Sequence, residues 1–118
     1  MLTFTNKRIH LACGATDMRK QINGLVAIIE CSFDLNPLDA AIFVFCNRAR
    51  DRVKILEWDE DGFWLYFKRL EGGRFKWPST SDDGVTMHFN DRELTLLLEG
   101  PKVAQKLKRK ELKINAII

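Results

Sequence analysis

The fold is decided by residues 40–70, AAIFVFCNRARDRVKILEWDEDGFWLYFKRL. The apolar run Ala40–Cys46 is dense in aromatic and β-branched residues, which predicts a buried central strand. Arg52–Trp58 and Phe63–Leu70 alternate in polarity, so each predicts a strand with two different faces. Asp61-Gly62 between them is a strong hairpin signal, because glycine tolerates the positive φ that a tight turn requires. This stretch therefore predicts neighbouring antiparallel strands.

The flanking segments predict further strands and helices. Three short strands are expected at Ile9–Cys13, Arg74–Trp77 and Val85–Phe89. Apolar residues at helical spacing predict a first helix, capped by Thr16 or Asp17; they are Met18, Ile22, Leu25, Val26 and Ile29. Asn90 and Glu93 have the spacing of a capping box, which predicts a second helix that ends at Gly100. The basic segment Lys102–Ile118 is either a third helix or a partly disordered arm.

Together these elements predict an α+β fold: an antiparallel β-meander of about four or five strands, with two or three helices packed on one face. The length of 118 residues indicates one domain. We expect residues 1–101 to form this domain and residues 102–118 to form a basic tail.

The sequence carries no targeting or disulfide pattern. Its longest apolar run, Ala40–Cys46, has seven residues, too few for a membrane helix. Met1–Arg8 lacks the basic-then-apolar design of a signal peptide. The three cysteines, Cys13, Cys31 and Cys46, are odd in number and widely spaced, which favours free thiols and a cytoplasmic location.

No residue pattern points to catalysis or to a bound metal. Phosphate-binding loops and the nucleophile-elbow motif do not occur in the sequence. His10, Cys13 and His88 do not make a zinc-ligand set, and the acidic turn before Gly62 has its glycine too early for a calcium loop. We therefore expect no enzymatic activity, no cofactor and no metal, with an unrecognised active site as a lesser alternative.

The positive charge is unevenly distributed around a net charge of +3. Residues 1–54 carry eight Lys/Arg and five Asp/Glu, residues 55–100 carry five and ten, and residues 101–118 carry six and one. Within the first region, four basic residues are spaced by two, which in an extended segment places them on one face; they are Arg48, Arg50, Arg52 and Lys54. The following strands add Lys68, Arg69, Arg74 and Lys76.

Aromatic residues lie among these cations, and Trp64, Tyr66 and Trp77 are the candidates for stacking or interaction. Basic side chains neutralise phosphates and aromatic rings stack on unpaired bases, so the pattern is typical of a nucleic-acid-binding face. A protein-contact face fits the spacing as well, and so does a solvated surface without a specific role.

The sequence also resembles a known family over Ile9–Gly100. The matching motifs are Ala15–Lys20 with Gly24-Leu25, Phe43–Leu56, Asp61–Leu65, Gly73–Pro78 and Leu94–Gly100. In order and content they resemble the small TnpB accessory proteins of IS-66-type bacterial insertion sequences, also described as Orf-two-like proteins.

The resemblance implies a non-catalytic protein that is encoded beside a separate transposase and supports transposition. We expect it to bind DNA at the element ends, or the transposase–DNA complex, through the basic and aromatic sheet face. The alternative is an adaptor that contacts the transposase and no nucleic acid. No membrane or small-molecule partner is expected. Asp17 and Arg19 are expected to cap the first helix and to pair with each other.

Overall fold

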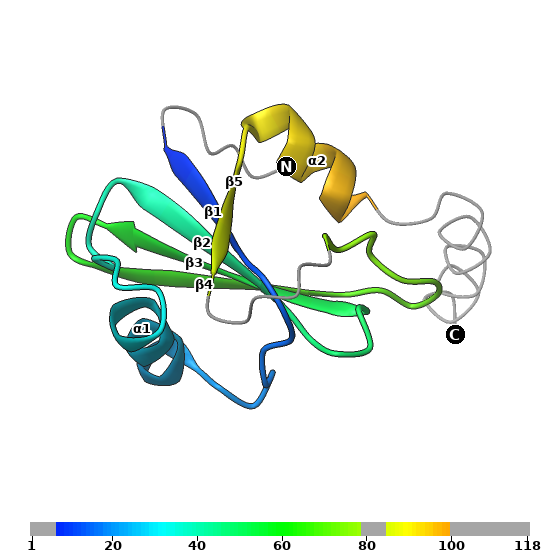
Figure 1. Ribbon diagram of the computed structural model, residues 1–118, viewed down its shortest axis with the longest axis horizontal. Helices are drawn as coiled ribbons and strands as arrows, with labels where there is room; N and C mark the ends of the chain where they lie inside the picture. Colours follow the sequence, from blue (N-terminus) through cyan, green and yellow to red (C-terminus); the bar gives the residue numbers. More distant parts are fainter. Residues whose placement is uncertain (1–6, 79–84, 100–118) are drawn as a thin grey trace, which may run out of the picture.

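A computed structural model describes residues 7–78 and 85–99 of the chain. In chain order the elements are β1 (Arg8–Ala12), α1 (Ile22–Cys31), β2 (Ala41–Cys46), β3 (Arg52–Asp59), β4 (Gly62–Arg69), β5 (Thr86–Phe89) and α2 (Asp91–Leu98). The strands form one sheet in the order β4-β3-β2-β1-β5, as Figure 1 shows. The expected tail at residues 102–118 and the expected helix end at Gly100 lie outside the described residues.

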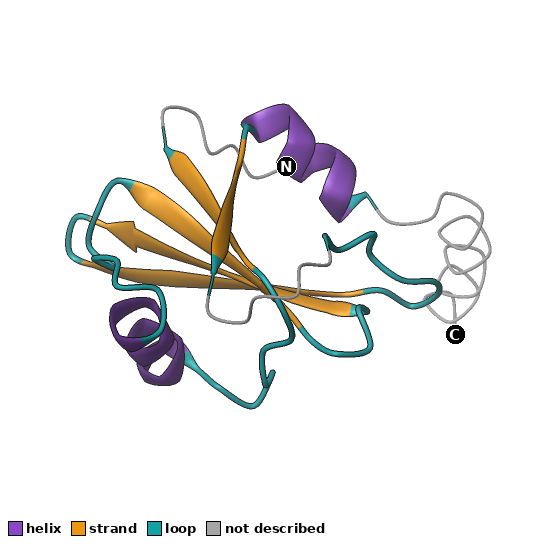
Figure 2. Cartoon of the chain, in the orientation of Figure 1, coloured by secondary structure: helices purple, strands orange, loops and turns teal. Residues whose placement is uncertain are grey.

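The central strand β2 is buried along its whole length. Its side chains alternate between two hydrophobic clusters, with Phe43 and Phe45 in one and Ile42 and Val44 in the other. Helix α1 covers the first face and α2 the second, so the sheet is the middle of three layers (Figure 2). Burying each large apolar side chain contributes about 1.5–3 kcal/mol, so β2 is a main source of stability.

Helix α1 crosses over between two parallel strands. β1 and β2 are parallel, and such a connection needs a crossover that packs back on the sheet. Leu25 and Ile29 of α1 are fully buried against Phe43, Phe45 and Leu56 of the sheet. All other neighbouring strands are antiparallel.

The opposite face is covered jointly by α2 and the segment after β4. Leu94 and Leu97 of α2 are buried together with Phe75 and Trp77. The indole nitrogen of Trp77 donates a hydrogen bond to the Ala12 carbonyl, at 3.1 Å. This bond holds the segment after β4 against β1, which lies on the other side of the central strand β2 from β4.

Two of the predictions about architecture are wrong. The α+β class is confirmed, but the sheet is mixed rather than a pure antiparallel meander. The two helices of the described residues lie on opposite faces instead of one. The helices lie on opposite faces because the apolar side chains of β2 point to both faces of the sheet, and a strand that is buried on both faces needs a layer on each side.

Three local predictions also need correction. Helix α1 begins at Ile22 with Gln21 as N-cap, so neither Thr16 nor Asp17 caps it. Residues 74–77 form no strand; the Phe75 N–H bonds to the Arg50 carbonyl in the turn, and the Trp77 N–H bonds to the Phe75 carbonyl. In the β3–β4 hairpin the positive φ, 53°, falls at Glu60 rather than at the glycine.

We expect Asn90→Ala to lower the free energy of unfolding by about 1 kcal/mol. The Asn90 side chain accepts a hydrogen bond from the Glu93 N–H at 2.8 Å, and the Glu93 carboxylate accepts one from the Asn90 N–H at 3.1 Å. Urea denaturation gives the measurement, with Asn90→Asp as the control that keeps the accepting oxygen. An unchanged midpoint for Asn90→Ala, or an equal loss in the control, would contradict the capping role.

Candidate nucleic-acid interface

Two connections of the chain meet at one end of the sheet. The turn between β2 and β3 accepts two backbone hydrogen bonds from the segment that follows β4: Phe75 N donates to Arg50 O and Leu70 N to Asp51 O, each at 2.7 Å. We call the resulting surface, residues 47–52 and 68–76, the basic end. It holds seven basic residues against two acidic ones, Asp51 and Glu71; the basic residues are Arg48, Arg50, Arg52, Lys68, Arg69, Arg74 and Lys76.

The opposite end of the same strands is acidic. Asp59, Glu60 and Asp61 form the β3–β4 hairpin, and all three side chains are exposed. Strands of this length separate the two ends by about 24 Å, beyond the Debye length of about 8 Å in physiological salt. The sheet therefore carries opposite charge at its two ends.

The turn before β3 has a defined shape. The Asn47 side-chain oxygen accepts hydrogen bonds from the N–H groups of Asp51 and Arg52, both at 3.0 Å, and its amide nitrogen donates to the Asp51 carboxylate at 2.7 Å. Arg50 has a φ of 61°, a left-handed conformation that costs an L-residue about 1–2 kcal/mol. The side-chain bonds of Asn47 offset this strain and present Arg48 and Arg50 on a fixed turn.

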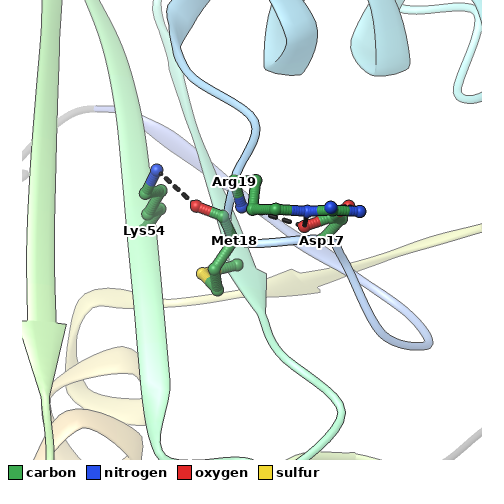
Figure 3. Close-up of polar contacts among 4 residues, drawn as sticks. All are labelled: Asp17, Met18, Arg19 and Lys54. Atoms are coloured by element: carbon green, nitrogen blue, oxygen red, sulfur yellow. Dashed lines mark hydrogen bonds and ion pairs between the residues drawn. The ribbon is translucent and has the colours of Figure 1, made fainter.

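The predicted row of four cations on one strand face does not exist. Arg48 and Arg50 belong to the turn, and only Arg52 and Lys54 lie on β3. Lys54 is 6% exposed, and its ammonium donates to the carbonyls of Met18 at 2.9 Å and Lys20 at 2.7 Å. Figure 3 shows the bond to Met18. Lys54 is thus a structural residue that anchors the segment before α1.

The other predicted cations differ in their surroundings. Lys68 donates to the Leu98 carbonyl at 2.6 Å, and Arg69 forms a two-bond pair with Glu71 at 2.7 and 3.1 Å. Arg52 is partly exposed, and its guanidinium lies 3.9 Å from the Asp51 carboxylate. The remaining four have exposed side chains and make no ion pair within residues 7–78 and 85–99; they are Arg48, Arg50, Arg74 and Lys76. These four are the cations of the basic end that are available to an anionic partner.

Asp17 and Arg19 pair as expected, although they cap no helix. The guanidinium of Arg19 bonds both carboxylate oxygens of Asp17 at 2.7–3.1 Å, a geometry visible in Figure 3. The Asp17 carboxylate also accepts from the Arg19 N–H at 2.9 Å. The side-chain hydrogen bond from Arg19 is the main cause that lowers the pKa of Asp17 to about 2.

Sequence reasoning missed an open groove of about 720 Å³ beside this pair. The groove runs between the segment before α1 and strands β3 and β4, and Arg52 connects it to the basic end. Its lining residues are Asp17, Met18, Arg19, Gln21, Arg52, Lys54, Leu65 and Phe67. The only sequence signal was the alternation of Leu65 and Phe67 on one face of their strand.

The predicted aromatic residues are not interleaved with the free cations. Trp77 is 6% exposed and belongs to the core, so its predicted role in stacking or interaction is wrong. Trp64 and Tyr66 stack on each other at 6.2 Å in the middle of β4. The Tyr66 hydroxyl donates to Glu57 at 2.9 Å; burial, and then this bond, raise the pKa of Tyr66 to about 12.

The part of the chain that the structure describes contains no group of three or more His, Cys, Asp or Glu side chains that is arranged to hold a metal ion. None of its helices has both the length and the apolar character required to cross a bilayer.

The fold and the site define a small α+β protein whose most distinctive surface is a basic end. Comparison with known proteins gives its family: the model described as "IS66 Orf2 like protein" matches residues 7–108. The chain therefore belongs to the IS66 Orf2-like family of insertion-sequence proteins, as the sequence resemblance implied. This family has an accessory role in transposition and is associated with the transposase of IS66 elements.

Two relatives come from Sinorhizobium fredii. The uncharacterized protein y4hO is 38% identical over 95 residues, which cover 80% of this chain and 81% of that protein. The uncharacterized protein y4jC is 36% identical over 93 residues, covering 79% and 78%. No solved structure matches the chain significantly.

We expect Lys54→Met to destabilise the protein by about 1–3 kcal/mol, because it leaves two carbonyls without their donor. The substitution keeps an unbranched side chain of similar length and removes only the ammonium. Thermal unfolding gives the stability, and Arg48→Met, at an exposed position, is the matched control. A Lys54→Met protein as stable as the control would contradict the structural role of Lys54.

Proposed function

We propose that this accessory protein binds DNA phosphates through the basic end during transposition of its insertion sequence. One observation carries the proposal: the backbone hydrogen bonds of Phe75 and Leu70 to the turn carbonyls hold two basic connections together. Four exposed cations from separate parts of the chain thereby share one surface. Arginine and lysine side chains on such a surface neutralise phosphates and release counterions.

The charge distribution gives this binding a direction. The acidic hairpin at Asp59–Asp61 lies at the far end of the same strands, where DNA is repelled. The protein therefore meets DNA with the basic end first, through electrostatic steering. Arg52 connects the basic end to the adjacent groove, where Arg19 is neutralised by its pair with Asp17.

The mode of contact follows from the residues that are exposed. Stacking on unpaired bases requires accessible rings beside the cations, but the rings nearest to Arg74 and Lys76, Phe75 and Trp77, are buried. The protein therefore contacts the DNA backbone, and its binding is largely independent of base sequence. Recognition of the element ends then belongs to the transposase, and this chain plays a non-catalytic role beside it.

We expect Arg48→Gln with Arg74→Gln to weaken DNA binding and to reduce its salt dependence. Each lost phosphate contact lowers the slope of log K against log salt by about 0.9, so the double variant loses about 1.8. The measurement is fluorescence anisotropy with a labelled element-end duplex, from about 50 to about 200 mM salt.

The matched control is Arg8→Gln with Arg92→Gln, which removes the same charge at the opposite end. Arg8 begins β1 next to Ala41, and Arg92 lies in the first turn of α2, so both are remote from the basic end. An equal loss in this control would contradict binding by the basic end. No binding of the native protein at low salt would overturn the DNA proposal, and transposase co-purification would then favour the adaptor alternative.

A further inference from the structure

Strand β4 is an open edge of the sheet. It has eight residues and only one neighbour, β3, so half of its backbone N–H and C=O groups have no strand partner among the described residues. The other edge strand, β5, has four residues and is contacted by α2. Long edges without proline, bulges or cover are templates for pairing with another strand.

Side chains of β4 are also exposed, on both faces of the sheet. Phe67 is 56% exposed on the α1 face and Trp64 is 54% exposed on the α2 face. They are two of the five large hydrophobic residues that are exposed in the described part of the chain. An edge strand that is apolar on both faces is suited to continuation of the sheet, rather than to contact with one flat surface.

We propose that a second copy of this chain pairs with β4, antiparallel and around a two-fold axis, to form one ten-stranded sheet. The choice of partner rests on charge complementarity. Each copy has the acidic Asp61 before β4 and the basic Arg69 at the end of β4. Antiparallel pairing of two identical strands brings the acidic start of one copy to the basic end of the other, twice.

The two-fold axis restricts the register. In an antiparallel pair, opposite residues point to the same face, so residues at equal distances from the axis must share a face. The axis therefore passes between the two copies of one residue, and the registers with the largest overlap are centred on Leu65 or on Tyr66. The Tyr66 register places Asp61 opposite Glu71 of the second copy, which is repulsive.

The Leu65 register is the one that the charges favour. It places Asp61 opposite Arg69 of the second copy, and Phe63 opposite Phe67. On the other face, Trp64 lies opposite Tyr66. Cross-strand aromatic pairs and opposite charges stabilise antiparallel strands, so this register covers both exposed rings and pairs the charged ends.

Formation of this interface requires little rearrangement. Arg69 pairs with Glu71 in the single chain, but its side chain is 53% exposed, and such exposed pairs contribute little. Arg69 is therefore free to exchange partners. Of the basic end, the paired strand contains Lys68 and Arg69, and the interface leaves Arg48, Arg50, Arg74 and Lys76 outside it. These four cations therefore stay available to DNA in the dimer.

Charge reversal tests the pairing. We expect light scattering after gel filtration to give twice 13.7 kDa for the native chain. Asp61→Arg and Arg69→Asp should each give the single-chain mass, and the double variant should restore the dimer. Arg92→Asp, which makes the same change of charge on α2, should stay dimeric.

Cross-linking tests the register. In a Cys31→Ser background the other two cysteines are buried, so Leu65→Cys should form a disulfide-linked dimer on oxidation and Tyr66→Cys should not. A single-chain mass for the native protein at every concentration would overturn the proposal. So would a dimer that resists both charge reversals, or one that cross-links through Tyr66→Cys alone.

Discussion

The burial of β2 on both faces is the constraint on which the rest of the structure depends. A strand whose side chains are all buried requires a layer on each side of the sheet. Helix α1 supplies the first layer as the crossover from β1. The second layer needs more than the short helix α2, and Phe75 and Trp77 complete it. The hydrophobic core therefore determines where the segment after β4 must run.

The basic end is a consequence of this packing. Residues 74–77 alternate between basic and aromatic side chains, so burial of Phe75 and Trp77 turns Arg74 and Lys76 toward solvent. The same path brings the Phe75 N–H to the Arg50 carbonyl, on a turn shaped by Asn47. The same four residues, 74–77, therefore supply two side chains to the core and two cations to the surface.

The sequence allowed the five strands of the sheet, the second helix and its cap to be predicted, because those features depend on local alternation and capping. The sixth predicted strand, at residues 74–77, does not form. Strand order is not local, which is why the parallel β1–β2 pair and the placement of the helices were missed. Lys54 shows the same limit for the site. Lys54 does lie on the same strand as Arg52, as its spacing predicted. Its ammonium nevertheless donates to the carbonyls of Met18 and Lys20, which are 36 and 34 residues away in the sequence. The free cations were identified individually, but their common surface was created by tertiary contacts.

The central claim is that DNA meets this protein at the end of the sheet formed by residues 47–52 and 68–76. Amide chemical-shift mapping with a short duplex tests it most directly, because it reports every backbone position in a single titration. We expect changes concentrated in these two segments, with the hairpin at Asp59–Asp61 unaffected. Changes centred on that hairpin, or none at a duplex concentration that saturates binding, would contradict it.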